Sequence, residues 1–230
     1  ELTRAEVTPK AMKQPLLEEM SEFFTARVDM YDEHMLNNVE GCREGYNKMA
    51  ELIPESTETL LDLGCGTGLE LEQIFKRFPV LSVVGIDLSQ AMLERLQSKF
   101  PDKEVELICG NYFDVDLGEG VFDTAISFQT MHHFGHAEKV ALYTKIHKAL
   151  KLDGVYIEGD YMVTDQAVED QLFAECARLR QEMNLAEDEF YHFDTPCTID
   201  NQIMILKKAG FRDVNMVWRV ENTTLIVAKK

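Results

Sequence analysis

The chain has 230 residues, of which 45% are hydrophobic, and its formal net charge is −18. This length suits one domain, or one domain with an insertion, and the apolar content is ample for a hydrophobic core. The 41 acidic residues against 23 basic ones disfavour nucleic acid as a partner, because such a surface repels phosphate backbones and lacks a basic footprint.

The cysteines indicate the cellular compartment, and the lengths of the apolar runs indicate whether the chain can span a membrane. The five cysteines are an odd number without paired spacing, which predicts reduced thiols and a cytoplasmic protein. No C-x-x-C pair occurs, so a zinc ribbon is excluded, and we expect no bound metal. The longest apolar runs are far too short to span a bilayer, and we expect no membrane partner.

Helical spacing of apolar residues dominates the first part of the chain. Residues 1–12 are expected to be weakly structured. From Leu16 to Leu36 the apolar residues recur at helical spacing, which predicts an amphipathic helix. A second helix is expected over 41–53, and 54–57 is typical of the turn into a strand.

A glycine-rich loop follows the first predicted strand. The apolar run Thr59–Leu63 is short and dense enough for a buried strand, and helical spacing begins again over 69–78. Between them lie Gly64, Gly66 and Gly68. Glycines let the backbone approach a ligand that a Cβ would block, and the amides that open the helix are free donors. A strand, a glycine turn and a helix in this order indicate a ligand-binding loop.

Asp62 indicates which kind of ligand this loop favours. The loop is G-x-G-x-G and no lysine follows it, so it is not the phosphate loop G-x-x-x-x-G-K-[ST]. It is also not a full G-x-G-x-x-G, because Leu69 stands where the third glycine would be. The carboxylate of Asp62, just before Gly64, would disfavour a dinucleotide pyrophosphate. The same carboxylate would favour a ligand that carries an ammonium and a sulfonium.

A second acidic residue ends the next predicted strand, over 81–89. Asp87 lies roughly 20 residues after Gly64, the offset at which an acidic side chain binds a ribose hydroxyl in a βαβ unit. Ser89 is then placed to cap a helix that runs through Met92.

The sequence D-L-G-C-G-T-G from Asp62, with G-I-D-L-S from Gly85, resembles the class I S-adenosylmethionine (SAM)-dependent methyltransferases. The similarity continues through Asn111, Phe122–Asp123 and the strand at Gly154. It implies a three-layer, doubly wound α/β fold with a seven-stranded, mainly parallel sheet whose last strand is antiparallel. It also implies SAM as cofactor and S-adenosylhomocysteine as product. The alternative is a Rossmann-like domain that binds NAD or no ligand.

The resemblance also implies which residues contact the cofactor. The residue after the third strand, 105–109, usually lies beside the adenine, and Asn111 can accept from its amino group or donate to a ring nitrogen. The alternative for Asn111 is a simple turn residue, and for Tyr31 a core-facing aromatic. The expected cofactor-binding residues are Tyr31, Asp62, Gly64, Cys65, Gly66, Asp87, Leu88, Met92, Asn111, Tyr112 and Gln129.

Polar residues follow the fourth predicted strand, Phe122–Phe128. Ligands of a doubly wound sheet bind where such strands end, so Gln129 should line the cofactor pocket. His132 and His133 follow at the same rim. We expect at most one of them to be functional, because consecutive residues cannot both face inward. His136 should begin the next helix.

The chain after Gly154 departs from regular alternation. A fifth strand is expected from Gly154 to Tyr161, and a charged helix over 165–184 interrupts the α/β pattern. The aromatic cluster within 187–198 is typical of a loop on the substrate side. A final helix and a hairpin of two strands should follow, over 200–210, 211–218 and 222–228.

These elements divide the chain into four predicted parts. They are an N-terminal helical lid (1–53), a SAM-binding core (54–161), a helical and aromatic insertion over the substrate side (162–198), and a final helix with a hairpin that completes the sheet (199–230).

The chemistry places few demands on the sequence. Methyl transfer from a sulfonium is an in-line displacement in which the enzyme mostly positions the two reactants, and a base is needed only for a protonated acceptor. His133 and His192 are the candidate bases, with His132 behind them, and Tyr161 could orient the acceptor. Each histidine could instead be a capping or surface residue. The same region could also hold a metal ion, through His133, Glu158, Asp160 and His192.

The predicted function is SAM-dependent methyl transfer to an oxygen, nitrogen or sulfur of a small-molecule acceptor, by a monomer or homodimer. A carboxy-SAM synthase would use the same scaffold but would need an arginine such as Arg178, Arg180 or Arg219 to hold a carboxylate. The scaffold would also suit a tRNA-modifying enzyme or a non-catalytic SAM-binding regulatory module.

Overall fold

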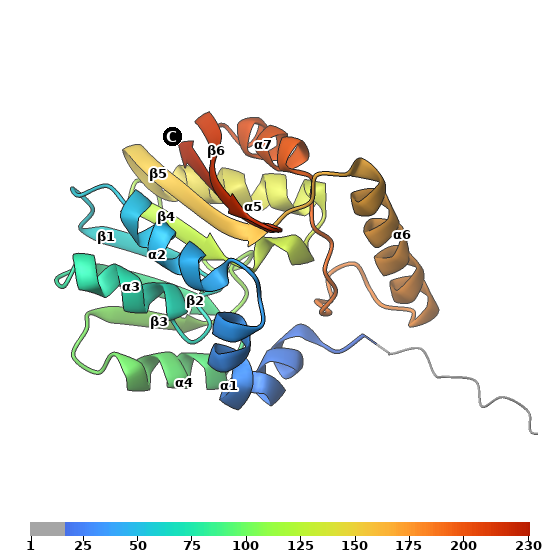
Figure 1. Cartoon of the computed structure of the whole chain (residues 1–230), viewed down its shortest axis with the longest axis horizontal. Coiled ribbons are helices and arrows are strands. Elements are labelled where there is room, and N and C mark those ends of the chain that lie inside the picture. Colours follow the sequence, from blue (N-terminus) through green and yellow to red (C-terminus); the bar gives the residue numbers. More distant parts are fainter. Residues whose placement is uncertain (1–16) are drawn as a thin grey trace, which may run out of the picture.

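The computed structural model describes residues 17–230, and the predictions made for residues 1–16 lie outside this range. A seven-stranded sheet of order β3-β2-β1-β4-β5-β7-β6 forms its centre (Figure 1). β5 begins at Leu150, earlier than the predicted Gly154. The strands are β1 (Thr59–Leu63), β2 (Ser82–Asp87), β3 (Val105–Cys109), β4 (Phe122–Phe128), β5 (Leu150–Tyr161), β6 (Arg212–Val220) and β7 (Thr223–Lys229).

The direction of each strand follows from its connection. β1 pairs in parallel with β2 and β4, and the parallel pairing continues outward to β3 and β5. β7 is antiparallel to both of its neighbours. Residues 221 and 222 alone join it to β6 in a hairpin, which requires these two strands to be antiparallel. The predicted sheet, mainly parallel with an antiparallel last strand, is confirmed.

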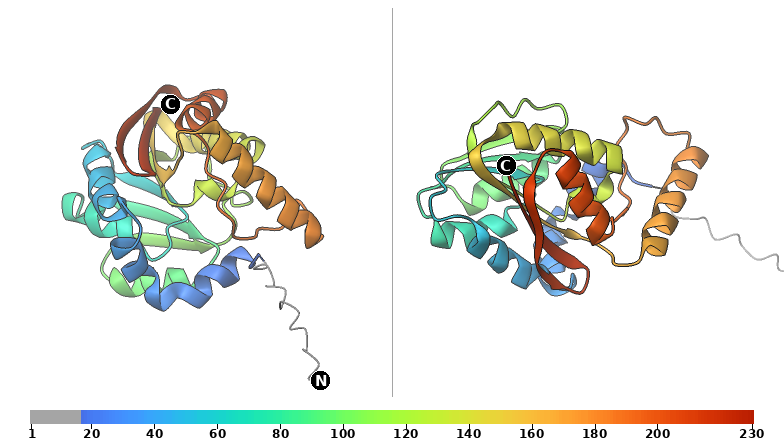
Figure 2. Two further views of the ribbon diagram at one scale, coloured as in Figure 1. Left: turned by 45° about the vertical axis from the view of Figure 1, so that its right-hand side comes forward. Right: turned by 90° about the horizontal axis from the view of Figure 1, so that it is seen from above.

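Helices cover both faces of the sheet, so the central strands are buried on both sides (Figure 2). Leu61 and Leu63 of β1 pack in one core with α5 and α7, whereas Leu60 packs in a second core with α2, α3 and α4. An unbroken apolar run suits a parallel strand covered on both faces. The bounds of these helices are α2 (Cys42–Leu52), α3 (Leu69–Arg77), α4 (Gln90–Lys99), α5 (His136–Ala149) and α7 (Ile199–Lys208).

Two helices, α1 (Met20–Asn37) and α6 (Gln166–Glu182), lie beyond the end of the sheet toward which the parallel strands point (Figure 1). The chain after α6 returns beside α1. The Met20 N–H donates to the Phe190 carbonyl at 3.0 Å, and the His192 N–H donates to the Glu18 carbonyl at 2.9 Å. Among residues 17–230, no helix has the length and apolarity needed to cross a membrane.

Candidate active site

The loop between β1 and α3 is built on glycines in the left-handed region. The φ angles of Gly64, Gly66 and Gly68 are +70°, +48° and +75°, which side chains rarely adopt. A Cβ on Gly64 would lie 2.6 Å from Oγ1 of Thr130, so this position also has no room for one. The Gly64 N–H donates to the Ile86 carbonyl at 2.8 Å and thereby fastens the loop to the end of β2.

Asp87, at the end of β2, lies directly beside this loop. Its Oδ2 accepts from the Gly66 N–H at 2.9 Å, and its Oδ1 accepts from the Ser89 N–H at 2.8 Å. Burial raises the pKa of the Asp87 carboxyl, against these backbone hydrogen bonds. Each oxygen keeps a further lone pair for a ligand. Ser89 is the cap of α4, as predicted.

Two buried carboxyl groups flank the other side of the loop. Asp62 of β1 is fully buried and Glu70 of α3 is 5% exposed. Both oxygens of Asp62 and Oε1 of Glu70 accept no hydrogen bond from the described part of the chain. Burial raises the pKa of both groups, that of Glu70 to about 7, and the Glu70 charge raises the pKa of Asp62 further. Asp62 was predicted from the sequence, whereas Glu70 was not.

Helix α1 crosses over the glycine loop. The Thr67 hydroxyl donates to Asp32, and Thr25 and Ser89 share a hydrogen bond of 2.8 Å between their hydroxyls. The Tyr31 ring lies close to Gly66, where an added Cβ would be 3.8 Å from Tyr31 Cε1. Tyr31, expected near the methyl donor, also lines the large cavity next to this loop.

Two other expected cofactor residues, Asn111 and Tyr112, form hydrogen bonds within the protein. Asn111 forms a local turn, in which its Oδ1 accepts from the Phe113 N–H at 2.9 Å and its Nδ2 donates to Asp114 at 3.1 Å. These contacts are those of a simple turn residue. Tyr112 is buried, and its hydroxyl pairs with that of Thr130 at 2.9 Å.

Among the other expected cofactor residues, Leu88 and Met92 have apolar side chains, and Cys65 has only a thiol. Cys65 and Met92 are 2% and 1% exposed, and both side chains are buried in the protein. Cys65 Sγ packs so close to β2 that a Cβ on Gly85 would lie 2.9 Å from it. Leu88 is half-buried, and its carbonyl accepts from the Cys109 thiol.

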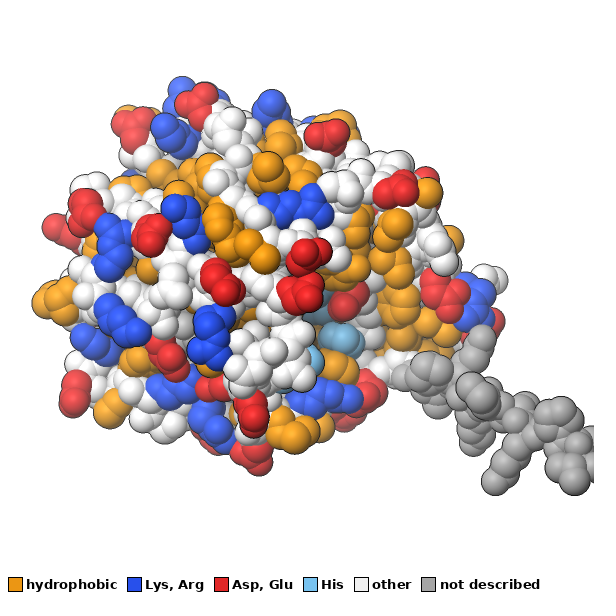
Figure 3. Space-filling view, viewed as in Figure 1, with side chains coloured by type: hydrophobic (Ala, Val, Ile, Leu, Met, Phe, Trp, Pro, Cys, Tyr) orange, Lys and Arg blue, Asp and Glu red, His pale blue; other side chains and the backbone are white. Residues whose placement is uncertain are grey.

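A cavity of about 1050 Å³ opens beside α1, and Tyr31 both lines it and lies against Gly66 of the glycine loop. Figure 3 shows histidine side chains in a hollow on this face, with acidic side chains at its edge. Six residues named from the sequence line the cavity: Tyr31, Gln129, His132, His133, Tyr161 and His192. Aromatic and aliphatic side chains of α1 form much of the remaining wall, with Phe23, Phe24, Met30 and Met35.

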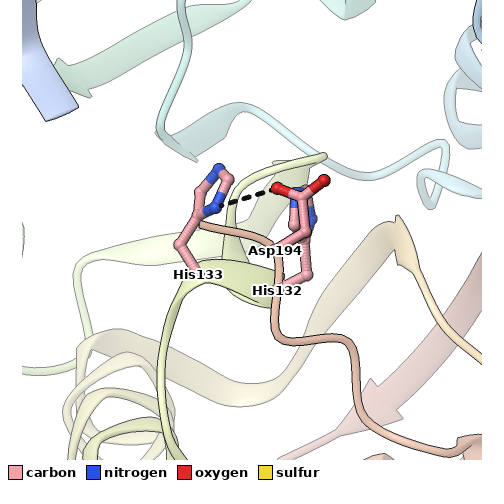
Figure 4. Close-up of side chains that lie close together, drawn as sticks. All are labelled: His132, His133 and Asp194. Carbon is pink, nitrogen blue, oxygen red and sulfur yellow. Dashed lines mark ion pairs between the residues drawn. The ribbon is translucent and has the colours of Figure 1, made fainter. Parts of the chain in front are cut away.

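Both histidines of the rim line this cavity, so the prediction that consecutive residues cannot both face inward is wrong. It assumed strand geometry, whereas His132 and His133 belong to a short 3₁₀ helix, Met131–His133. Figure 4 shows both rings beside Asp194. His132 Nε2 lies 3.4 Å and His133 Nδ1 lies 3.5 Å from Asp194 Oδ1.

The histidines are held by different partners. Nδ1 of His132 lies 2.6 Å from Oδ1 of the buried Asp160, and Nδ1 of His133 lies 3.3 Å from the Phe193 carbonyl. A bond from the His133 Nδ1–H to this carbonyl leaves the Nε2 of His133 as the acceptor. His192 stacks on the ring of Phe23 at a centroid distance of 3.6 Å.

These environments drive the histidine pKa values apart. Burial opposes a charge on His132, but the carboxylates of Asp160 and Asp194 raise its pKa to about 9. Burial lowers the pKa of His133 well below its usual value, and the neighbouring His132 charge lowers it further. Burial also lowers the pKa of His192. At neutral pH His132 is therefore cationic, whereas His133 and His192 are neutral.

Residues 60–154 match the protein-family model of a methyltransferase domain. The chain also aligns over 96% of its length with a solved structure of a putative O-methyltransferase from Nostoc punctiforme, at a TM-score of 0.70 and 20% identity. Residues 60–154 thus resemble a methyltransferase domain, and the fold of the chain is that of the class I SAM-dependent methyltransferases. These matches bear out the predicted SAM cofactor.

Other proteins that resemble this chain differ in the activity that their names give. The carboxy-S-adenosyl-L-methionine synthase of Nautilia profundicola is 24% identical over 96% of this chain and 99% of that protein. Human N-acetylserotonin methyltransferase, solved with SAM, has a TM-score of 0.65 at 17% identity over 92% of this chain. The chain spans 64% of the Nostoc protein and 56% of the human one.

The proposed metal ligands do not converge in this methyltransferase fold. Glu158 Oε2 accepts from the hydroxyls of Tyr143 and Tyr156, and its Oε1 accepts from Gln202. Glu158 is therefore occupied inside the core, and the four residues considered as an alternative metal site do not come together. The potential ligands that do gather at the cavity are His132, His133 and Asp194.

The arginines proposed as carboxylate holders are all engaged elsewhere. Arg178 pairs with glutamates of its own helix, α6. Arg180 donates to the carbonyl of Glu189, and Arg219 donates to that of Glu221.

Arg27 is the one arginine of the described chain that lines the cavity, and no sequence pattern had assigned it a role. Its guanidinium pairs with Glu18 at 2.8 Å and lies 3.6 Å over the ring of Phe23.

Three other features of this site were not predicted from the sequence: Glu70, Asp194 and the pairing of Asp160 with His132. Asp160 was visible as an acidic residue at the end of a predicted strand. Asp194 stood within the aromatic cluster that was predicted to face the substrate. Asp194 meets the histidines because the loop 190–198 returns across the strand ends. No local sequence pattern encodes that path.

Proposed function

We propose that this protein transfers the methyl group of SAM to a small-molecule acceptor whose oxygen, nitrogen or sulfur nucleophile carries a proton. The observation that supports this best is the cavity of about 1050 Å³ beside the glycine loop, with histidines of separated pKa in its wall. When bound, SAM supplies a methyl group on a positively charged sulfur.

The residues around the glycine loop fit this cofactor. Gly64 leaves no room for a Cβ and Gly66 adopts a left-handed backbone, so the loop can approach a ligand closely. The carboxylate of Asp87 has lone pairs free for both ribose hydroxyls. The unpartnered carboxyl groups of Asp62 and Glu70 suit the cationic end of the molecule. Tyr31, which lies against Gly66 and also lines the cavity, would lie between the cofactor and the acceptor.

On the acceptor side, His133 is the general base of this proposal. It is neutral at neutral pH, and the Phe193 carbonyl orients its Nδ1–H so that Nε2 can take a proton from the acceptor. The cationic His132, fixed between Asp160 and Asp194, keeps the pKa of His133 low. Tyr161 and His192 line the same cavity and orient the acceptor.

The charges at the cavity favour a neutral or cationic acceptor. Glu33, Glu40, Glu221 and Asp194 line it, whereas Arg27 is the single lysine or arginine in its described wall and is already paired with Glu18. An anionic acceptor would meet net repulsion there. The total charge of −18 and the acidic rim argue in the same direction against tRNA.

A labelled-methyl experiment tests the proposal. The protein is incubated with methyl-labelled SAM and a metabolite extract, and in a separate arm with bulk tRNA. Label should appear in a small molecule, with S-adenosylhomocysteine as the second product, and should not appear in tRNA. In calorimetry S-adenosylhomocysteine should bind and NADH should not. Label transferred to tRNA would contradict the small-molecule acceptor.

Carboxy-SAM synthesis is the second candidate function. It is favoured by the relatives of that name, which align over 96% of this chain. That reaction needs a cation to hold a carboxylate, and Arg27 could serve only after leaving Glu18. Mass spectrometry of the ligand that co-purifies with the protein distinguishes the two, because carboxy-SAM would favour the synthase and S-adenosylhomocysteine the methyltransferase.

A further inference from the structure

Lys139, on the first turn of α5, is buried in the core of the protein. Its exposed fraction is 1%, and its Nζ donates to Cys197 Sγ at 3.3 Å and to Gln202 Oε1 at 3.1 Å. It donates to no carboxylate within residues 17–230. A lysine is almost never fully buried unless it is paired with an opposite charge. The mechanism proposed above does not use this amine, and its unusual neighbour is the thiol of Cys197.

Cys197 is enclosed to the same degree. It is 1% exposed and is a free cysteine. Burial raises the pKa of its thiol, and the nearby Lys139 opposes this shift. The backbone on both sides of the contact is anchored, because the Val163 N–H donates to the Cys197 carbonyl at 3.0 Å and the Lys139 N–H donates to the Gly135 carbonyl at 3.0 Å. The fold therefore holds the amine and the thiol against each other.

A second, smaller cavity of about 450 Å³ lies between the start of α5 and α6. His136 and Glu169 line it, and a nitrogen or oxygen atom of each lies within 4.8 Å of Cys197 Sγ. These two side chains are paired with each other at 2.7 Å, and Glu169 also accepts from the Thr198 N–H. They therefore leave the thiol to Lys139. A molecule as small as dioxygen can approach the thiol from this cavity, whereas the burial of Cys197 excludes larger reagents.

We propose that Lys139 and Cys197 form an oxidative cross-link in which one oxygen atom bridges Nζ and Sγ. The ammonium first releases a proton to solvent. The amine, the thiol and one molecule of dioxygen then give the N–O–S bridge and one molecule of water. One N–H bond, the S–H bond and the O–O bond break, while an N–O, an S–O and two O–H bonds form. Nitrogen and sulfur are each oxidised by two electrons, and dioxygen accepts all four.

The distance between the two atoms favours this bridge over a direct bond. A single bridging atom nearly spans the 3.3 Å between Nζ and Sγ, so the side chains need only a small movement. A direct S–N bond would require a far closer approach of two groups that are both held by the packed core.

The cross-link would fasten two segments of the acceptor half to each other. α5 begins shortly after His132 and His133, and Cys197 ends the loop that carries Asp194. A covalent bond between these segments restricts the unfolded chain, as a disulfide does. We therefore expect the oxidised protein to unfold at a midpoint at least about 4 °C higher than the reduced protein.

Mass spectrometry of the full chain tests the proposal. Protein purified with dithiothreitol is transferred to air-saturated buffer or is kept without oxygen. The aerated sample should gain one oxygen atom and lose two hydrogen atoms per chain, and fragmentation of a digest should place the link between Lys139 and Cys197. Dithiothreitol should restore the original mass. Isotopically heavy dioxygen should label the bridge, which distinguishes it from an added methyl group.

Variants and a matched control localise the reaction. Lys139→Met removes the amine and Cys197→Ser removes the thiol, and each should abolish both the cross-link and the gain in thermal stability. Cys42→Ser is the control. Cys42 is also fully buried, but its Sγ contacts Thr223 and Gln129 and no lysine, so this variant should still form the cross-link.

Each other outcome would overturn the proposal. An unchanged mass after aeration, or a link between other residues, would show that this pair is not the site. Loss of two hydrogen atoms without a gain of oxygen would show a direct S–N bond in place of the bridge. The experiment on the parent protein needs no variant, so it holds even if Lys139→Met or Cys197→Ser folds poorly. None of these results depends on the methyl acceptor, which the labelled-methyl experiment tests separately.

Discussion

The two halves of the candidate site are built in different ways. The cofactor half lies within 62–89, where two strands, a glycine loop and two helix starts follow one another in the chain. The acceptor half collects its residues from α1, the rim after β4, the end of β5, the loop before α7 and the β6–β7 turn. The first is mainly backbone geometry, and the second is mainly side-chain placement.

This difference should appear in how the halves respond to substitution. Changes in the cofactor half should alter ligand affinity or the stability of the loop. Changes in the acceptor half should alter turnover or its pH dependence and leave cofactor affinity intact.

The largest effect is expected for His133→Ala. Loss of a general base typically lowers turnover by about 100-fold or more, while S-adenosylhomocysteine affinity should stay within twofold. Initial rates of label transfer and calorimetry measure the two quantities. His147→Ala, on α5 against Phe211, is the control and should keep its rate. Unchanged turnover in His133→Ala would remove the base from the mechanism.

Asp87→Ala should weaken S-adenosylhomocysteine binding at least tenfold and leave the fold intact. The lost charge-assisted hydrogen bonds to the ribose are each worth roughly 1.5–3 kcal/mol. Calorimetry gives the dissociation constant, and circular dichroism checks the fold. Asp102→Ala, at an exposed turn, is the control. An equal constant in Asp87→Ala and the parent would place the ribose elsewhere.

Gly64→Ala should lower the free energy of unfolding by about 1–3 kcal/mol, because a left-handed backbone is strained with a side chain. The added Cβ would also lie 2.6 Å from Thr130 Oγ1. Gly110→Ala is the matched control, since its nearest neighbour would be 3.3 Å away and its φ is not left-handed. Urea unfolding of both variants measures the difference, and equal stabilities would contradict the role of the loop geometry.

A smaller effect is expected from Asp160→Asn on the pH dependence of stability. The folded pKa of His132 is raised to about 9, above its unfolded value, so its stabilisation is complete below the unfolded pKa of about 6.5. The stabilisation is lost as pH rises through about 9. As pH rises from about 6.5 to about 9, the Asp160→Asn variant should lose less stability than the parent. Thermal unfolding across this pH range tests it, with Asp102→Asn as control.

Removal of metal should have the smallest effect. We predict no bound metal ion, so incubation with EDTA should leave the rate of label transfer unchanged. The trio of His132, His133 and Asp194 makes this a real test, because imidazole and carboxylate ligands suit several divalent ions. A rate abolished by EDTA and restored by one metal would contradict the prediction.

Local sequence signals were sufficient to predict the central strands and the glycine loop between them. Hydrophobic period and glycine spacing predicted β1, β3 and β4 with their ends, β2 to within two residues, and the placement of Asp62, Gly64 and Asp87 at the ends of β1 and β2. They worked because a buried parallel strand and a left-handed glycine turn are each encoded within a few residues.

The acceptor half, in contrast, arises only when the chain is folded. The 3₁₀ turn lets His132 and His133 share one cavity, and the loop before α7 brings Asp194 to both. Glu70 became visible as a partner of Asp62 only when both were seen to be buried without donors. Such features depend on contacts between segments far apart in the chain and on the desolvation of charge, which sequence spacing does not specify.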